Sequence, residues 1–290
     1  MSCERSAPGC ASVFSIVTLP ARVPVCERTL SHTKVREERE TWPTWEQPGP
    51  ERVFALALAQ FLHPDIVQAV VEDNEVHRVT WIEALKSRQI DPTAYLWAKS
   101  SCAFPGVRRY SGSREIASHN GLIQLDENQG IEALALDDND YPKQLWSFVF
   151  RGKQFAKAGP NGYALAHLAD HKNHGNRFEE DFVLKDGAEP HALFGLYTCP
   201  SNTVYISQSL IKPTDFVGTI RALLVRRAQQ LYGEFCEIVP PFLHIPVPSA
   251  EWDVNQFTWA DPVGTTKHIH DFLAFRQYRM EKLINKTLPC

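Results

Sequence analysis

A short polar segment in the middle of the chain, residues 167–176, concentrates side chains that could carry out chemistry. It follows an apolar stretch that begins at Tyr163, and its reactive side chains are His167, Asp170, His171, Lys172, Asn173, His174 and Asn176. An aspartate beside a histidine suits metal-assisted hydrolysis, because the carboxylate can hold a hard divalent cation while the imidazole takes a proton from the attacking water. The pair Asp170–His171 therefore predicts a metal-dependent hydrolytic site.

Several other enzyme classes are disfavoured by residue spacing. In a helix His167 and His171 would share one face, as in a zinc protease, but the glutamate expected after the first histidine is replaced by Leu168. The chain has no G-x-S-x-G nucleophile elbow, no phosphate loop and no dinucleotide fingerprint. A metalloprotease, a serine hydrolase and a nucleotide-dependent enzyme are therefore poor interpretations.

The order of elements around Asp170–His171 resembles the HNH, or ββα-metal, nuclease superfamily. A strand precedes the pair, a second strand follows Asn202 in the run CPSNTVYISQSLIKPTD, and a helix comes next. The resemblance spans residues 163–232, about a quarter of the chain. It implies that His171 is the general base, that Asp170 binds the metal and that Asn202 orients the histidine.

The sequence departs from that family where a second metal ligand is expected on the helix side. The residues there are Ser207, Ser209, Leu210 and Lys212, and the zinc-knuckle cysteines of many members are also missing. Three alternatives stay open: His167, His174 or Asp215 supplies the ligand, or one carboxylate and the substrate phosphates hold the metal, or the site is degenerate. The cofactor implied is a divalent ion, Mg²⁺, Mn²⁺ or Zn²⁺.

The expected function is metal-dependent hydrolysis of phosphodiester bonds in a nucleic acid, with DNA favoured over RNA as partner. Phosphate contacts are expected from Lys172 and from arginines on the surface of a later helix, namely Arg221, Arg226 and Arg227. One alternative is a non-catalytic module that binds nucleic acid or protein through its basic helices and the aromatic residues Trp252, Phe257 and Trp259. Another is a metal hydrolase of a small molecule, and a homodimer is left open.

Each candidate residue also has a plainer structural interpretation. His167 could be a hydrogen-bonded structural histidine, Asn202 a turn residue before a strand, and the arginine-bearing helix faces could simply be solvated. The acidic run Asp137, Asp138 and Asp140 is interpreted as a solvated turn, and the cluster Arg108, Arg109 and Arg114 as a positively charged loop.

Composition indicates a globular protein in a reducing, cytoplasmic compartment. The 290 residues are 43% hydrophobic and carry a formal charge of −4, which argues against a uniformly basic nucleic-acid-coating surface. The seven cysteines are odd in number and scattered, without a close pair of zinc-site spacing, and are interpreted as free thiols. No run approaches the ~20 apolar residues of a membrane helix, so no membrane partner is expected.

The hydrophobic patterning predicts an α+β protein. Residues 1–50 read as an irregular arm, 51–140 as a helical subdomain with a helix starting at Pro64, and 141–290 as an α+β catalytic domain. In that domain a small sheet is expected to pack on a helix over residues 220–232, and a last helix is expected from His270. Strands are predicted over 145–150, 163–168, 192–198 and 203–207.

Overall fold

The computed structural model describes residues 53, 56–96, 102–109, 117, 133–137, 139–154, 159–168, 186–187, 195–210, 219–239, 244–245, 247, 255 and 257–285. The segment Thr44–Cys290 forms one compact unit. Its described elements are α-helices, short 3-10 turns and two small two-stranded sheets, so the predicted α+β class is correct.

The longest described helix, α2 (Pro64–Ser87), begins where the sequence places a start signal. Pro64 suits the first helical position because its fixed φ is helical and its missing N–H would have no partner there. The His63 ring accepts a hydrogen bond from the Asp65 N–H (Nδ1 to N, 3.3 Å), which caps the end. The helix is continuous over its 24 residues and buries Trp81 and Leu85 in its last turns.

The predicted strands near residues 163 and 203 and the predicted helix near residue 220 are present. Strand β3 (Tyr163–His167) pairs antiparallel with β4 (Thr203–Ser207), with His167 opposite Thr203. Helix α6 (Thr219–Tyr232) follows, and the Gly233 N–H closes it with a bond to the Gln229 carbonyl. Just before β3, Gly159 (φ +77°) sits so close to the Tyr205 ring of β4 that a Cβ there would overlap it.

Two of the predicted strands are wrong. Residues 145–150 lie inside helix α4 (Asp140–Arg151), and the last residues of the predicted strand over 192–198 form the 3-10 turn η2 (Leu196–Thr198). An apolar run as short as LWSFVF does not distinguish a strand from a buried helix turn by periodicity. A helix forms because the Asp137 carboxylate accepts the N–H groups of Asp140 and Tyr141 at 3.2 and 2.9 Å, which caps α4.

The second sheet joins segments that the sequence did not identify as strands. Strand β1 (Val107–Arg109) pairs in parallel with β2 (Ala135–Asp137). Arg108 is therefore in a strand and only 3% exposed, and Asp137 is 7% exposed. The predictions of a charged arginine loop and a solvated acidic turn are wrong for these two residues.

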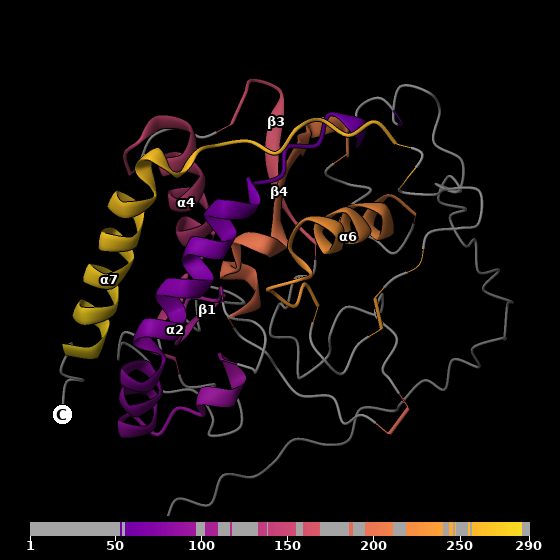
Figure 1. The fold of residues 1–290 in the computed structure, drawn as a ribbon. Helices are drawn as coiled ribbons and strands as arrows, with labels where there is room; N and C mark the ends of the chain where they lie inside the picture. Colours follow the sequence, from indigo (N-terminus) through magenta and orange to yellow (C-terminus); the bar gives the residue numbers. More distant parts are fainter. Residues whose placement is uncertain are drawn as a thin grey trace, which may run out of the picture. The chain divides into compact units, whose positions relative to one another are not determined.

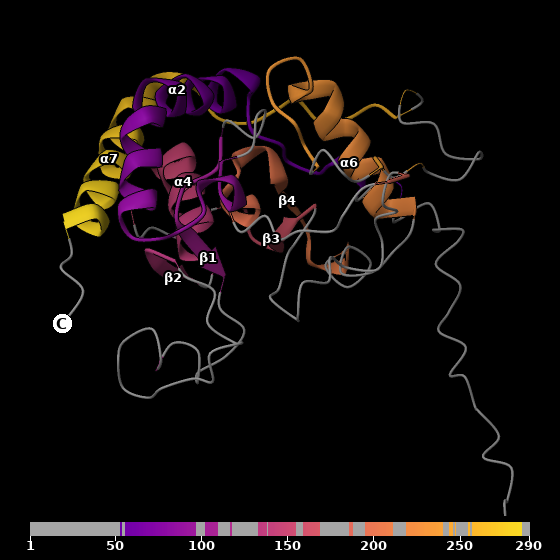
Figure 2. The same cartoon turned by 90° about the horizontal axis from the view of Figure 1, so that it is seen from below.

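Helix α7 (Ile269–Asn285), predicted from residue 270 onward, packs beside α2 and α4 (Figures 1 and 2). The contact is organised by Arg276, whose side chain is fully buried. Its guanidinium donates to the Asp73 carboxylate and to the Tyr141 hydroxyl, both at 2.6 Å, to the Asn74 side-chain oxygen, and to the Ala103 carbonyl at 3.0 Å. Elements from both halves of the sequence thus share one core.

Within the described parts of the chain, none of the helices combines the length and the apolar character needed to cross a membrane.

Candidate functional site

Four of the nine predicted site residues lie outside the described residues. Asp170, His171, Lys172 and His174 belong to that part of the chain, as do Arg114, Asp138 and Asp215 among the other residues singled out. His167, Asn202 and the three arginines of α6 are described. The geometry of the site is therefore built from the end of β3, the start of β4 and α6.

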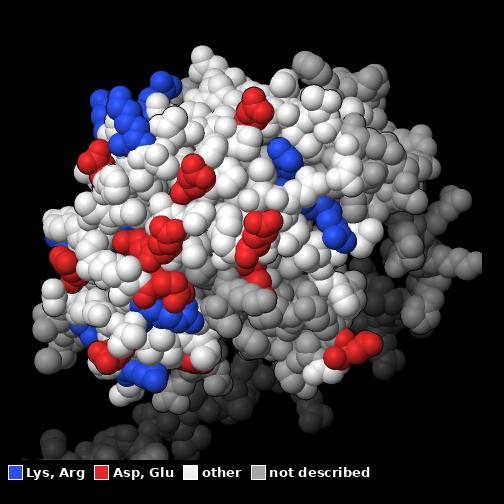
Figure 3. Space-filling view, in the orientation of Figure 1, with Lys and Arg blue, Asp and Glu red and all other residues white. Residues whose placement is uncertain are grey.

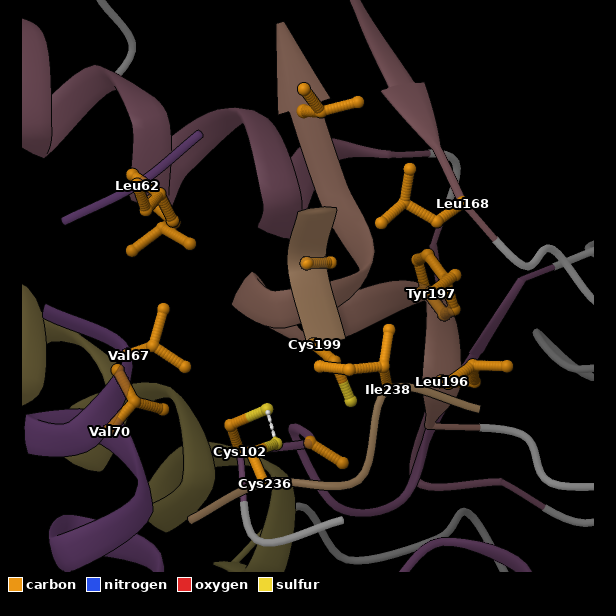
Figure 4. Packing of buried hydrophobic residues seen from close by; sticks show 14 of the residues in the cluster. Leu62, Val67, Val70, Cys102, Leu168, Leu196, Tyr197, Cys199, Cys236 and Ile238 are labelled. Carbon is orange, nitrogen blue, oxygen red and sulfur yellow. Dashed lines mark hydrogen bonds between the residues drawn. The ribbon is translucent and has the colours of Figure 1, made fainter. Parts of the chain in front are cut away.

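These three elements meet at Leu168, the residue directly after β3. Its N–H donates to the Asn202 carbonyl (2.9 Å), and its own carbonyl accepts a hydrogen bond from Arg221 Nε on α6 (2.6 Å). The Leu168 side chain is 1% exposed and packs in the core near Leu196 and Tyr197 (Figure 4). The backbone is thus held on both sides at the point where the chain enters the polar segment.

His167, at the end of β3, is half-buried, with Nε2 3.2 Å from the Tyr197 carbonyl oxygen. A carbonyl oxygen can only accept a hydrogen bond, so Nε2 carries the proton and the neutral ring has its lone pair on Nδ1. Burial lowers the pKa of His167 from 6.5 to about 3, and the positive charges of Arg109, Arg221 and Lys143 act in the same direction. The imidazole is therefore neutral at physiological pH.

Metal-binding histidines commonly have this arrangement, in which the second ring nitrogen donates to a backbone carbonyl. The described residues contain no group of three His, Cys, Asp or Glu side chains that could hold a metal ion. His167 fits the role of a single ligand, and the other predicted ligands, Asp170 and His174, lie outside the described part of the chain.

Asn202 holds the turn that leads into β4. It is fully buried, its side-chain amide donates to the Leu196 carbonyl (3.2 Å), and its N–H donates to the Cys199 carbonyl (3.0 Å). These bonds join the 3-10 turns η2 and η3 (Pro200–Asn202), so Asn202 has a structural role in positioning β4.

The three arginines predicted on the surface of α6 differ in their placement. Arg221 is 3% exposed and bonded to Leu168, so its prediction as a surface residue is wrong. Arg226 and Arg227 are half-buried, and the Arg227 guanidinium lies 5.8 Å from the centre of the Trp259 ring. On the face drawn in Figure 3, acidic and basic side chains of the described residues are interspersed.

A buried polar contact beside His167, between Tyr197 and Asp137, was not predicted from the sequence. The Tyr197 hydroxyl donates to the Asp137 carboxylate (3.3 Å), while the Tyr197 carbonyl meets the His167 ring. Burial raises the pKa of Asp137, although the Tyr141 N–H and the charge of Arg279 oppose this shift. Asp137 lies two residues before the N-cap residue, Asn139, so it is outside the usual capping position, and nothing local indicates that it would be buried.

No protein-family model, curated protein or solved structure matches this chain.

Proposed function

We propose that the protein is a metal-dependent nuclease that hydrolyses phosphodiester bonds, with DNA favoured over RNA. The observation that carries the proposal is the junction at Leu168, where the ends of an antiparallel strand pair and the following helix are joined by Asn202 and Arg221. This order of two strands and a helix is the arrangement that the HNH resemblance implies around the Asp170–His171 pair.

The chain connection favours a site at this junction. Asp170 and His171 follow Leu168 by two and three residues in the sequence. His171 is proposed as the base that takes a proton from water, and Asp170 as the carboxylate ligand. Asn202 is proposed to position this segment through its carbonyl bond to the Leu168 N–H.

His167 is proposed as a neutral metal ligand through Nδ1. Its low pKa means that protons do not compete with a cation for this nitrogen until the solution is strongly acidic. When bound, a divalent cation would stabilise the charge that develops on the phosphate. The positive charges of Arg109, Arg221 and Lys143 around His167 favour an anionic substrate such as a phosphodiester.

The test is cleavage of supercoiled plasmid, linear duplex DNA and single-stranded RNA by the full-length protein. Each reaction contains Mg²⁺, Mn²⁺ or Zn²⁺, with a chelator as control. We expect metal-dependent nicking that His171→Ala and Asp170→Ala abolish. The matched control is His270→Ala, which removes an exposed imidazole from α7 and should cut as well as the parent. A His171→Ala variant as active as the parent, or a parent that cuts none of these substrates with any of the three metals, refutes the proposal.

The same samples separate the two alternatives. A binding module would shift the nucleic acid in a gel in the presence of chelator, equally for the parent and His171→Ala, and would cut nothing. A small-molecule hydrolase would bind metal in elemental analysis but would neither shift nor cut nucleic acid.

A further inference from the structure

Three cysteines that are far apart in the sequence meet in the core. Cys102 precedes β1, Cys199 lies between η2 and η3, and Cys236 follows α6. Their exposures are 0%, 1% and 3%. The Sγ atoms of Cys102 and Cys236 lie 3.2 Å apart (Figure 4). The sequence spacing gave no indication of this cluster, because its members come together only in the folded chain.

The buried Cys102 sulfur lies among polar groups. The Ser201 hydroxyl lies 3.2 Å from the Cys102 sulfur and 3.5 Å from the Cys236 sulfur. Burial raises the pKa of Cys102, but hydrogen bonds from Cys199, Cys236 and Ser201 outweigh it and hold the pKa below its usual range. The hydrogen bond to Cys102, followed by burial, raises the pKa of Cys236. The pair thus combines a thiolate-favouring sulfur with a protonated neighbour.

We propose that Cys102 and Cys236 form a disulfide when the protein meets a peroxide oxidant. A peroxide takes two electrons from the Cys102 thiolate and leaves a sulfenic acid, and the peroxide's other oxygen departs as water. The Cys236 sulfur then attacks the sulfenic sulfur, loses its proton, and the oxygen leaves as a second water. Two thiols and one hydrogen peroxide thus give one disulfide and two waters.

The geometry favours this pair over a pairing with Cys199. A disulfide needs a sulfur–sulfur distance near 2.05 Å, so the two sulfurs have to approach by only about 1.2 Å. Cys199 is fixed on both sides by backbone bonds, because its N–H donates to the Leu196 carbonyl and its carbonyl accepts from Asn202. Its sulfur also lies 3.8 Å from the Gly195 carbonyl oxygen.

The experiment uses the full-length chain with the four remaining cysteines, Cys3, Cys10, Cys26 and Cys290, replaced by serine. The reduced protein is treated with hydrogen peroxide, unfolded, alkylated and digested without reductant for mass spectrometry. We expect a linked peptide pair joining Cys102 to Cys236, with Cys199 alkylated, and complete reversal by dithiothreitol. Cys199→Ser should still form the link, whereas Cys236→Ser should not.

Oxidation should also raise the unfolding temperature, since the bond closes a loop between residues 134 positions apart. The comparison uses one polypeptide in two redox states, so the same substitutions are present in both samples. Three alkylated cysteines after treatment, a link that includes Cys199, or further oxidised but unlinked sulfurs would overturn the proposal. The readout is covalent and is independent of any nuclease activity.

Discussion

Replacing Arg276 by methionine should be among the most damaging single changes in the described core. The substitution keeps a long side chain but removes the charge and every donor of a guanidinium that is fully buried. Asp73, only 13% exposed on its side chain, then loses its ion-pair partner at 2.6 Å. The acceptors on Asn74, Tyr141 and Ala103 lose the same donor group.

The expected loss follows from the kind of interaction that is broken. Removing one partner of a buried ion pair costs about 3–5 kcal/mol, because the remaining charge stays buried without compensation. Arg276→Lys keeps the charge but cannot reach all four acceptors, so about 1–3 kcal/mol is expected. Guanidinium unfolding followed by circular dichroism measures both values.

The matched control is Arg279→Met, one turn further along α7, where the arginine is only half-buried. That change should cost less than about 1 kcal/mol. Adding Asp73→Asn to Arg276→Met should recover part of the loss, since the uncompensated carboxylate is then gone. If Arg276→Met unfolds within about 1 kcal/mol of the parent, or no more easily than Arg279→Met, the network does not hold α7 in place.

Three further predictions follow from single contacts. The His167 ring should stay neutral in NMR titrations to about pH 4. Because the unfolded state binds a proton that the folded state does not, the free energy of unfolding should decrease as the pH falls from 6.5 towards about 3. The variant His167→Gln should not show this part of the pH dependence. In urea titrations, Arg221→Met should lower the free energy of unfolding by about 1–3 kcal/mol, because it removes the buried bond to Leu168. The control Arg226→Met should lower it by less than about 1 kcal/mol. Equal losses for the two variants would contradict a contribution from that bond. Gly159→Ala should unfold at lower temperature than Gly162→Ala, since both have positive φ but only the first places a Cβ against a ring of β4; equal midpoints would exclude that clash.

The candidate site was only partly accessible to sequence reasoning. The pattern identified His167 and Asn202, and both lie at the junction of β3, β4 and α6. It did not identify Tyr197 and interpreted Asp137 as solvated, because the contact between them joins segments 60 positions apart in the chain. It also treated Arg221 as a surface residue, since a charged side chain on a helix is solvated unless a partner from elsewhere satisfies it.

The sequence pattern alone predicted those helices and strands whose start, stop or alternation signals lie within a few residues. Helix α2 starts at Pro64 because proline suits the first helical position, and helix α6 ends before Gly233, a helix-stop residue. The bounds of β4 follow from its strand-like run of residues. Tertiary structure decided that Arg276 is buried and that Cys102 meets Cys236. In each of these cases the deciding partner is distant in the chain, and burying a charge or bringing thiols together depends on contacts that local periodicity does not contain.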